Sequence, residues 1–129
     1  MRIRLLLLAS LCLGLIVQAH AQDVFAPMKD AIKTGNAKEV IKFFNGSVDM
    51  NLDGVASTYS KAQAEFVLRD FFKKYPASDF RIRHTGSSKG GLQFAIGEYV
   101  SNADSFDVLI RVKEVAGAYL IHEINFVKE

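Results

Sequence analysis

Two histidines and one tyrosine are the side chains of this chain that are best suited to moving a proton. His84 and His122 each stand in a run that alternates apolar and polar residues, and Tyr59 directly precedes Ser60, the expected cap of a helix. General acids and bases have pKa values near the working pH, and burial can shift a group into that range. Tyr59, His84 and His122 are therefore the candidate ligand-binding or acid-base residues. The structural alternative is that both histidines form core hydrogen bonds and that Tyr59 packs beside the cap.

Other catalytic and metal-binding patterns are weaker. Asp49 and Glu123 are the acidic candidates, but each alternates with apolar neighbours and is expected to face solvent. Adjacent strand residues point to opposite faces, so His122 and Glu123 are not expected to chelate one ion. The glycine-rich segment 86–91 lacks the Lys-Ser/Thr pair of a phosphate-binding loop and is interpreted as a turn. The sequence predicts neither a metal site nor a cofactor.

A second set of residues indicates a binding surface. Cationic, aromatic and aliphatic side chains are expected together on one face of a sheet, and exposed apolar area beside Arg and Tyr is typical of a protein interface. The expected interface residues are Arg81, Arg83, Tyr99, Leu109, Arg111, Tyr119 and Ile121. A homodimer, or another protein partner, is the interpretation that this composition favours.

The first 21 residues have the pattern of an export signal. Arg2 and Arg4 precede an apolar stretch over residues 5–17, and Ala19-His20-Ala21 is a small-x-small cleavage site. The apolar stretch is shorter than the roughly 20 residues of a membrane-spanning helix. We expect cleavage near Ala21 and a periplasmic or secreted protein, with residues 22–129 as a single domain and no membrane span. Cleavage would also remove Cys12, which is the only cysteine.

Charge argues against a general nucleic-acid partner. The full chain has 16 Lys and Arg against 14 Asp and Glu. Removal of residues 1–21 would take away Arg2 and Arg4 and leave 14 of each, whereas binding to a phosphate backbone needs an excess of positive charge.

Helical signals dominate the first half of the domain. Apolar spacing predicts a helix from residue 24 to Gly35, and a short second helix from Asn36, where Glu39 completes a capping-box spacing, to Asn45-Gly46. Ser60 and Gln63 form another capping box and begin a long helix, 61–75, whose expected buried stripe is Ala64, Val67, Leu68, Phe71 and Tyr75.

Strand signals dominate the second half. A small hairpin over residues 48–59, turning at Asp53-Gly54, precedes the long helix, and strands are expected over 80–85, 92–100, 106–115 and 118–127. Their short connections predict an antiparallel meander. Alternation places His84, Phe94, Ile96, Leu120 and His122 on the helix-covered face, together with Phe80, Ile82, Phe106, Val108, Ile110, Val112, Ile124 and Phe126. The fold class is α+β, with three N-terminal helices packed on a curved antiparallel sheet.

Several short strings carry a resemblance to known proteins. They are Ala31-Ile32-Lys33-Thr34-Gly35-Asn36-Ala37, Tyr59-Ser60-Lys61-Ala62-Gln63-Ala64, Asp70-Phe71-Phe72, His84-Thr85-Gly86 and Ala95-Ile96-Gly97. With the element order, they resemble an exported bacterial family known as domain of unknown function 4783, within the nuclear transport factor two-like (cystatin-like) superfamily. The resemblance implies a cone-shaped fold, a bacterial source and a location outside the cytoplasm. It implies no activity.

Two classes of function follow. The first is a non-catalytic exported module that binds a small apolar ligand in the cone or a protein partner, foremost a second copy, on the open sheet face. The alternative is a small acid-base enzyme of the isomerase, dehydratase or cyclase type, using His84 or His122 with Tyr59 on a hydrophobic substrate. In the isomerases that the superfamily includes, the first helix supplies a tyrosine to the site, whereas this chain has Phe25, Met28 and Ile32 there. That departure favours the binding module.

Overall fold

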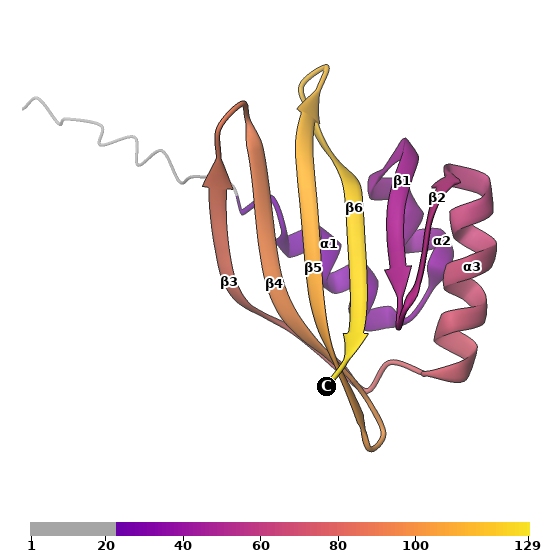
Figure 1. The fold of residues 1–129 in the computed structure, drawn as a ribbon. Coiled ribbons are helices and arrows are strands. Elements are labelled where there is room, and N and C mark those ends of the chain that lie inside the picture. The colour runs from indigo at the N-terminus through magenta and orange to yellow at the C-terminus, as the bar shows by residue number, and fades with distance from the viewer. Residues whose placement is uncertain (1–22) are drawn as a thin grey trace, which may run out of the picture.

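The computed structural model describes residues 23–129, so the predicted export signal lies outside the described residues. The elements follow in the order α1 (Ala26–Thr34), α2 (Ala37–Val40), the 3₁₀ helix η1 (Ile41–Phe43), β1 (Phe44–Leu52), β2 (Val55–Ser60), α3 (Lys61–Lys74), β3 (Asp79–Ser88), β4 (Leu92–Ser101), β5 (Asp104–Val115) and β6 (Ala118–Lys128). Figure 1 shows a curved sheet with α1 crossing behind it and α3 beside β2. The expected α+β class and four-strand meander are confirmed.

Two details of the predicted fold are wrong. The strand order is β2-β1-β6-β5-β4-β3, so the hairpin belongs to the same six-stranded sheet as the meander, and α3 follows the first two strands. The helices are therefore not all N-terminal to the sheet. In addition, β1 pairs with β6 in parallel, which makes the sheet mixed. Parallel neighbours need a long connection, and here it is formed by everything from β2 to β5, a pairing that short-range signals do not reveal.

Local signals place the helix ends well. The amide of Phe25 donates to Asp23 Oδ1 at 3.0 Å before α1, and Gly35 ends the helix with a left-handed φ of 67°. Ser60 and Gln63 form the predicted capping box of α3. The second helix is shorter than expected, because Phe44 already begins β1. Glu39 forms no capping box there, since its carboxylate pairs with Lys42 instead. No helix within residues 23–129 has the length and apolarity to cross a bilayer.

Aromatic rings fill the space between α3 and the sheet. Phe71 lies 4.8 Å from Phe126 and 5.3 Å from Phe106, measured between ring centroids, and Tyr99 lies 5.4 Å from Phe126. The Tyr99 hydroxyl donates to the Tyr75 carbonyl at 2.6 Å, so its buried polar group is satisfied. Burial raises the pKa of Tyr99 well above its usual value. The interior at this end of the cone is packed with side chains.

Two β-bulges decide which side chains face the helices. In β3 the register with β4 shifts between Ile82 and His84, so Arg83 is the extra residue and His84 turns outward. In β6 the register with β5 shifts so that His122 is the extra residue. Ile121, and not His122, then takes the buried inner position, where it is fully shielded from solvent.

The predicted face of β4 is also reversed. Ala95 and Tyr99 are buried against the helices, while Ile96 is 41% exposed on the opposite side. The inner position between them is Gly97, and a Cβ added there would lie 2.5 Å from the Arg81 carbonyl oxygen and 3.1 Å from the Phe80 ring. Glycine is required at position 97 because the backbone of β3 and the Phe80 ring approach closely from that side.

Candidate functional site: the outer face of the sheet

The side of the sheet that faces away from the helices, hereafter the outer face, carries an apolar centre. Leu92 and Ile96 on β4 and Val127 on β6 are 40%, 41% and 47% exposed, and they are half of the large exposed hydrophobic side chains of the described chain. Half-buried Phe94 and Leu109 lie among them. Ile96 is the register partner of His84 on one side and of Leu109 on the other. Ile96 and Leu109 are therefore adjacent across β4 and β5 and form the centre of an apolar patch, whereas Val127 lies beside Asp107.

The Phe94 ring lies across the neighbouring strand. Its register partner on β3 is Gly86, and a Cβ added to Gly86 would lie 2.6 Å from the ring. The ring centroid is 5.8 Å from that of His84. Glycine is therefore required at position 86 for the ring to lie flat, and this packing extends the apolar patch to the edge strand β3.

Two arginines neutralise one buried carboxylate at this edge. Arg81 Nη2 lies 3.2 Å from Glu98 Oε1, and Arg83 Nη2 lies 2.8 Å from Glu98 Oε2. Glu98 is only 8% exposed, so its charge depends on these partners. Arg81 lies two positions before Arg83 in β3, and the bulge brings both side chains to the same carboxylate. Both arginines are therefore already paired with Glu98 within the outer face.

The opposite part of the outer face is polar. Arg111 Nη1 lies 3.5 Å from Glu123 Oε1, and the Asn125 amide donates to Glu123 Oε2 at 2.9 Å. On β1, Asp49 accepts a hydrogen bond from Thr58 at 2.6 Å. Asp49 and Glu123 are register partners, and with the neighbouring amides they line a surface hollow over β2, β1 and β6. Both acids lie at the surface, as predicted, with Asp49 exposed and Glu123 part-buried.

The outer face is close to neutral. Four cations, Arg81, Arg83, Arg111 and Lys113, share it with four anions, Asp49, Glu98, Asp107 and Glu123, and Glu129 adds a fifth carboxyl at one end. At its lower end a hydrogen bond with Asp107 raises the pKa of the Glu129 carboxyl. A face whose charges nearly cancel costs less to desolvate than one with a large net charge, and it offers little attraction to a polyanion.

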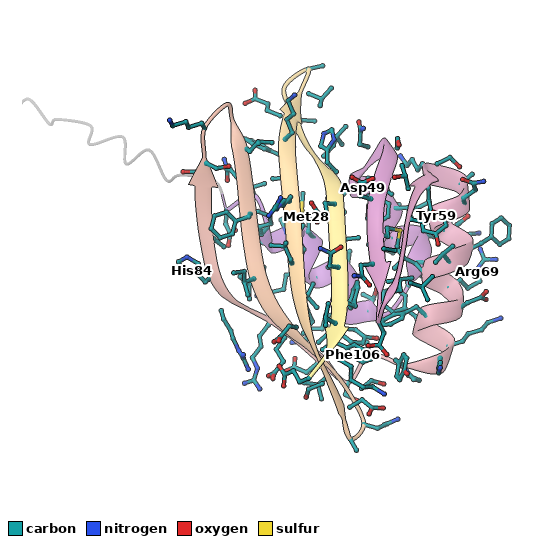
Figure 2. The ribbon with its side chains drawn as sticks, in the orientation of Figure 1. Met28, Asp49, Tyr59, Arg69, His84 and Phe106 are labelled. Atoms are coloured by element: carbon teal, nitrogen blue, oxygen red, sulfur yellow. The ribbon has the colours of Figure 1, made fainter. Side chains whose placement is uncertain are left out.

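The three predicted acid-base residues do not come together. Tyr59 is on β2 and His84 is on β3, which are the two opposite edges of the sheet (Figure 2). His122 lies between them at the bulge of β6, and its buried Nε2 has no hydrogen-bond partner in the described structure. Five hollows on the surface of residues 23–129 have none of the three in their lining. They do not form a shared proton-transfer site.

The predicted interface set separates into two groups. Arg81, Arg83, Leu109 and Arg111 lie on the outer face, as expected. Tyr99 and Ile121 are fully buried on the inner face, and Tyr119 packs against the core, so these three cannot line an outer interface. Sequence reasoning missed Leu92, Phe94, Ile96 and Val127. The sequence contained one signal for β4. Leu92, Phe94 and Ile96 alternate in step with Glu98, and a carboxylate is unfavourable inside a core, so this set of residues should face outward.

The described residues show no metal centre. Within residues 23–129, no three His, Cys, Asp or Glu side chains are grouped so that they could hold an ion.

Comparisons with known proteins agree with this architecture. A family model described as Domain of unknown function (DUF4783) matches residues 25–127. The crystal structure of a DUF4783 family protein from Bacteroides ovatus is 29% identical, with a TM-score of 0.76 over 81% of this chain and 94% of that one. The corresponding protein from Bacteroides uniformis is 26% identical, with a TM-score of 0.75 over 80% and 94% of the two chains.

The fold extends to more distant structures. A nuclear transport factor two-like protein of unknown function from Shewanella baltica is 11% identical, with a TM-score of 0.63 over 82% of this chain and 88% of that one. No curated protein matches the sequence. From the family match and the shared architecture, the chain belongs to the DUF4783 family of domains of unknown function, with a nuclear transport factor two-like (cystatin-like) α+β fold.

Proposed function

We propose that the protein is an exported, non-catalytic interaction module that pairs with a second copy of itself through the outer face of the sheet. The observation that carries the proposal is the apolar patch around Ile96, which lies on a nearly neutral face that no helix of residues 23–129 covers (Figure 1). Water-exposed apolar area rimmed by polar residues is typical of protein interfaces.

The size of the face supports a dimer. Strands β3 to β6 are 10 to 12 residues long. At about 3.3 Å per residue and about 4.8 Å per strand, these four strands and the shorter β1 and β2 give a face of roughly 900 Å². A standard interface buries about 800 Å² on each partner.

Its strand order allows a symmetric pairing with a second copy. In the strand order, β5 lies two strands from β3 and two strands from β1. A two-fold axis in the interface along β5 would place β3 of each copy over β1 of the other. By register, Asn51 lies on the same row of the sheet as His84, so His84 of one copy would face Asn51 of its partner, and the arrangement repeats itself by symmetry, as a closed dimer requires.

The test is the oligomeric state of two matched variants. Ile96→Glu puts a charge in the centre of the patch and should convert the dimer to a monomer in sedimentation equilibrium. Phe66 is 61% exposed on α3, so Phe66→Glu is the control for a charge introduced elsewhere on the surface and should leave the dimer intact. Circular dichroism verifies that both variants fold. A monomeric wild-type protein at 100 µM, or equal effects of the two variants, would contradict the proposal.

Export is part of the same proposal and rests on the pattern of residues 1–21. Intact mass measurement of the protein from the periplasm of a bacterial host should give a chain that begins at Gln22. A chain that retains residues 1–21 in the cytoplasmic fraction would contradict it.

A further inference from the structure

The helices carry an excess of positive charge. Together α1, α2, η1 and α3 contain eight Lys and Arg residues against four Asp and Glu, a net charge of +4. The remainder of residues 23–129 has six basic and ten acidic residues, a net charge of −4. The helices therefore carry most of the positive charge of residues 23–129, in contrast to the nearly neutral outer face, and such an excess attracts anions.

Three cations of the helix side surround one surface hollow. The hollow lies between the turn that joins α1 to α2 and the side of α3, and Lys38, Arg69 and Lys73 are among its lining residues. Arg69 and Lys73 are four residues apart on α3, with Phe72 between them, so the three side chains lie on one stripe of that helix. The lining contains no acidic residue.

The cations of this hollow are only weakly neutralised. Within residues 23–129 neither Lys38 nor Lys73 takes part in an ion pair. Arg69 Nη2 lies 3.7 Å from Glu65 Oε1, which is longer than the 2.7–2.9 Å of a tight charge-assisted bond. Its guanidinium also lies 5.2 Å from the centroid of the Phe66 ring, which restrains its position at the edge of the hollow.

The remaining lining of the hollow is mainly apolar. Phe72 and Ala37 are 6% exposed each, and both line it together with Gly35 and the polar Asn36. Two backbone amides near the hollow already form hydrogen bonds within the protein. The Lys38 amide donates to Asn36 Oδ1 at 3.0 Å, and the Gly35 amide donates to the Ile32 carbonyl. The hollow therefore combines an apolar lining with a cationic rim.

We propose that this cationic hollow binds a small organic anion that carries a carboxylate, phosphate or sulfate group on a short apolar body. The anionic group pairs with the rim of Lys38, Arg69 and Lys73, and the apolar body covers Phe72 and Ala37. The hollow is on the helix side of the molecule, so this proposal is independent of self-association through the outer face.

The test is a titration of the ¹⁵N-labelled protein with phenyl phosphate, followed by amide chemical shifts. Saturable shifts are expected at Gly35, Lys38 and Lys73. Inorganic phosphate, which has the charge without the apolar body, should bind more weakly, and benzyl alcohol, which has no charge, should produce no shifts at the same concentration. Equal binding of inorganic and phenyl phosphate, or no saturable shift at these amides, would overturn the proposal.

Matched lysine variants separate the site from general attraction. Lys73→Gln should weaken phenyl phosphate binding about two- to fivefold, the range for one exposed ion pair. Lys113→Gln removes a lysine from the outer face and should leave the affinity unchanged. Equal losses from the two variants would mean that the ligand responds only to net charge, and would overturn the site.

Vesicles decide the source of the anion. Co-sedimentation with phosphatidylglycerol vesicles that Lys73→Gln weakens and Lys113→Gln leaves unchanged would assign the anionic group to a lipid headgroup. With phenyl phosphate binding established, the absence of co-sedimentation would assign the hollow to a soluble anion.

Discussion

The two faces of the sheet use the same strands in different ways. On the inner face, Tyr99, Phe106 and Phe126 are shielded from solvent and each contacts at least two other aromatic rings. On the outer face, Leu92, Ile96 and Val127 remain about 40–50% exposed, and ion pairs connect the strands. Stability should therefore come mainly from the inner face, which leaves outer side chains available for binding.

The largest contrast is expected between a buried and an exposed apolar residue. Phe126→Ala would leave a cavity beside Phe71 and Tyr99 and should lower the free energy of unfolding by about 3–5 kcal/mol. Ile96→Ala on the outer face should cost less than about 0.5 kcal/mol in the monomer. Urea denaturation at low protein concentration measures both. Equal losses would show that the outer patch is part of the core.

Removing both partners of Glu98 tests the ionic part of the outer face. Arg81→Gln or Arg83→Gln alone should cost less than about 1 kcal/mol, because the other arginine remains. The double variant leaves a nearly buried carboxylate without a cation and should cost about 3 kcal/mol. Adding Glu98→Gln should recover most of that loss. Strict additivity of the single variants would contradict shared neutralisation.

Gly97 on the inner face and Gly86 on the outer face allow the two faces to be compared by the addition of one methyl group. Gly97→Ala would bring a Cβ to 2.5 Å from a backbone oxygen of β3, which cannot move alone, and should cost about 2 kcal/mol. Gly86→Ala would meet the Phe94 side chain, which can rotate away into solvent, so its cost should be below about 1 kcal/mol. Thermal denaturation of the two variants ranks them. The reverse order would show that the Phe94 ring is held rigidly.

The smallest effect concerns the Tyr99 hydroxyl. Tyr99→Phe removes its bond to the Tyr75 carbonyl and should cost about 1 kcal/mol at pH 7. Because burial raises the folded-state pKa, the neutral hydroxyl binds its proton more tightly when folded. The contribution of Tyr99 to stability is therefore fully present below pH about 10. Above that pH the free energy of unfolding falls by up to about 1.4 kcal/mol per pH unit. The phenylalanine variant should lack this component, so parallel alkaline unfolding curves would contradict the burial effect.

Local chemistry in the sequence determined the elements of this fold. Ser60 with Gln63, Gly35, and the turns at Asp53-Gly54 and Ala116-Gly117 act within a few residues, and the structure has an element boundary at each. Asp53 and Ala116 both adopt positive φ, as tight hairpin turns require. The family strings and the four-strand meander were recognisable for the same reason.

Tertiary structure alone decided which residues meet on the outer face. The extra residue Arg83 reverses the alternation of the residues after it in β3, so His84 faces outward. The extra residue His122 reverses the alternation of the residues before it in β6, so Ile121 faces inward. In β4 both alternating sets are partly apolar, and the approach of β3 to Gly97 selected Tyr99 for the core and Ile96 for the surface. Likewise, the cationic hollow joins Lys38 to Lys73 across 35 positions of sequence. Such long-range contacts depend on packing, which no local pattern of residues specifies.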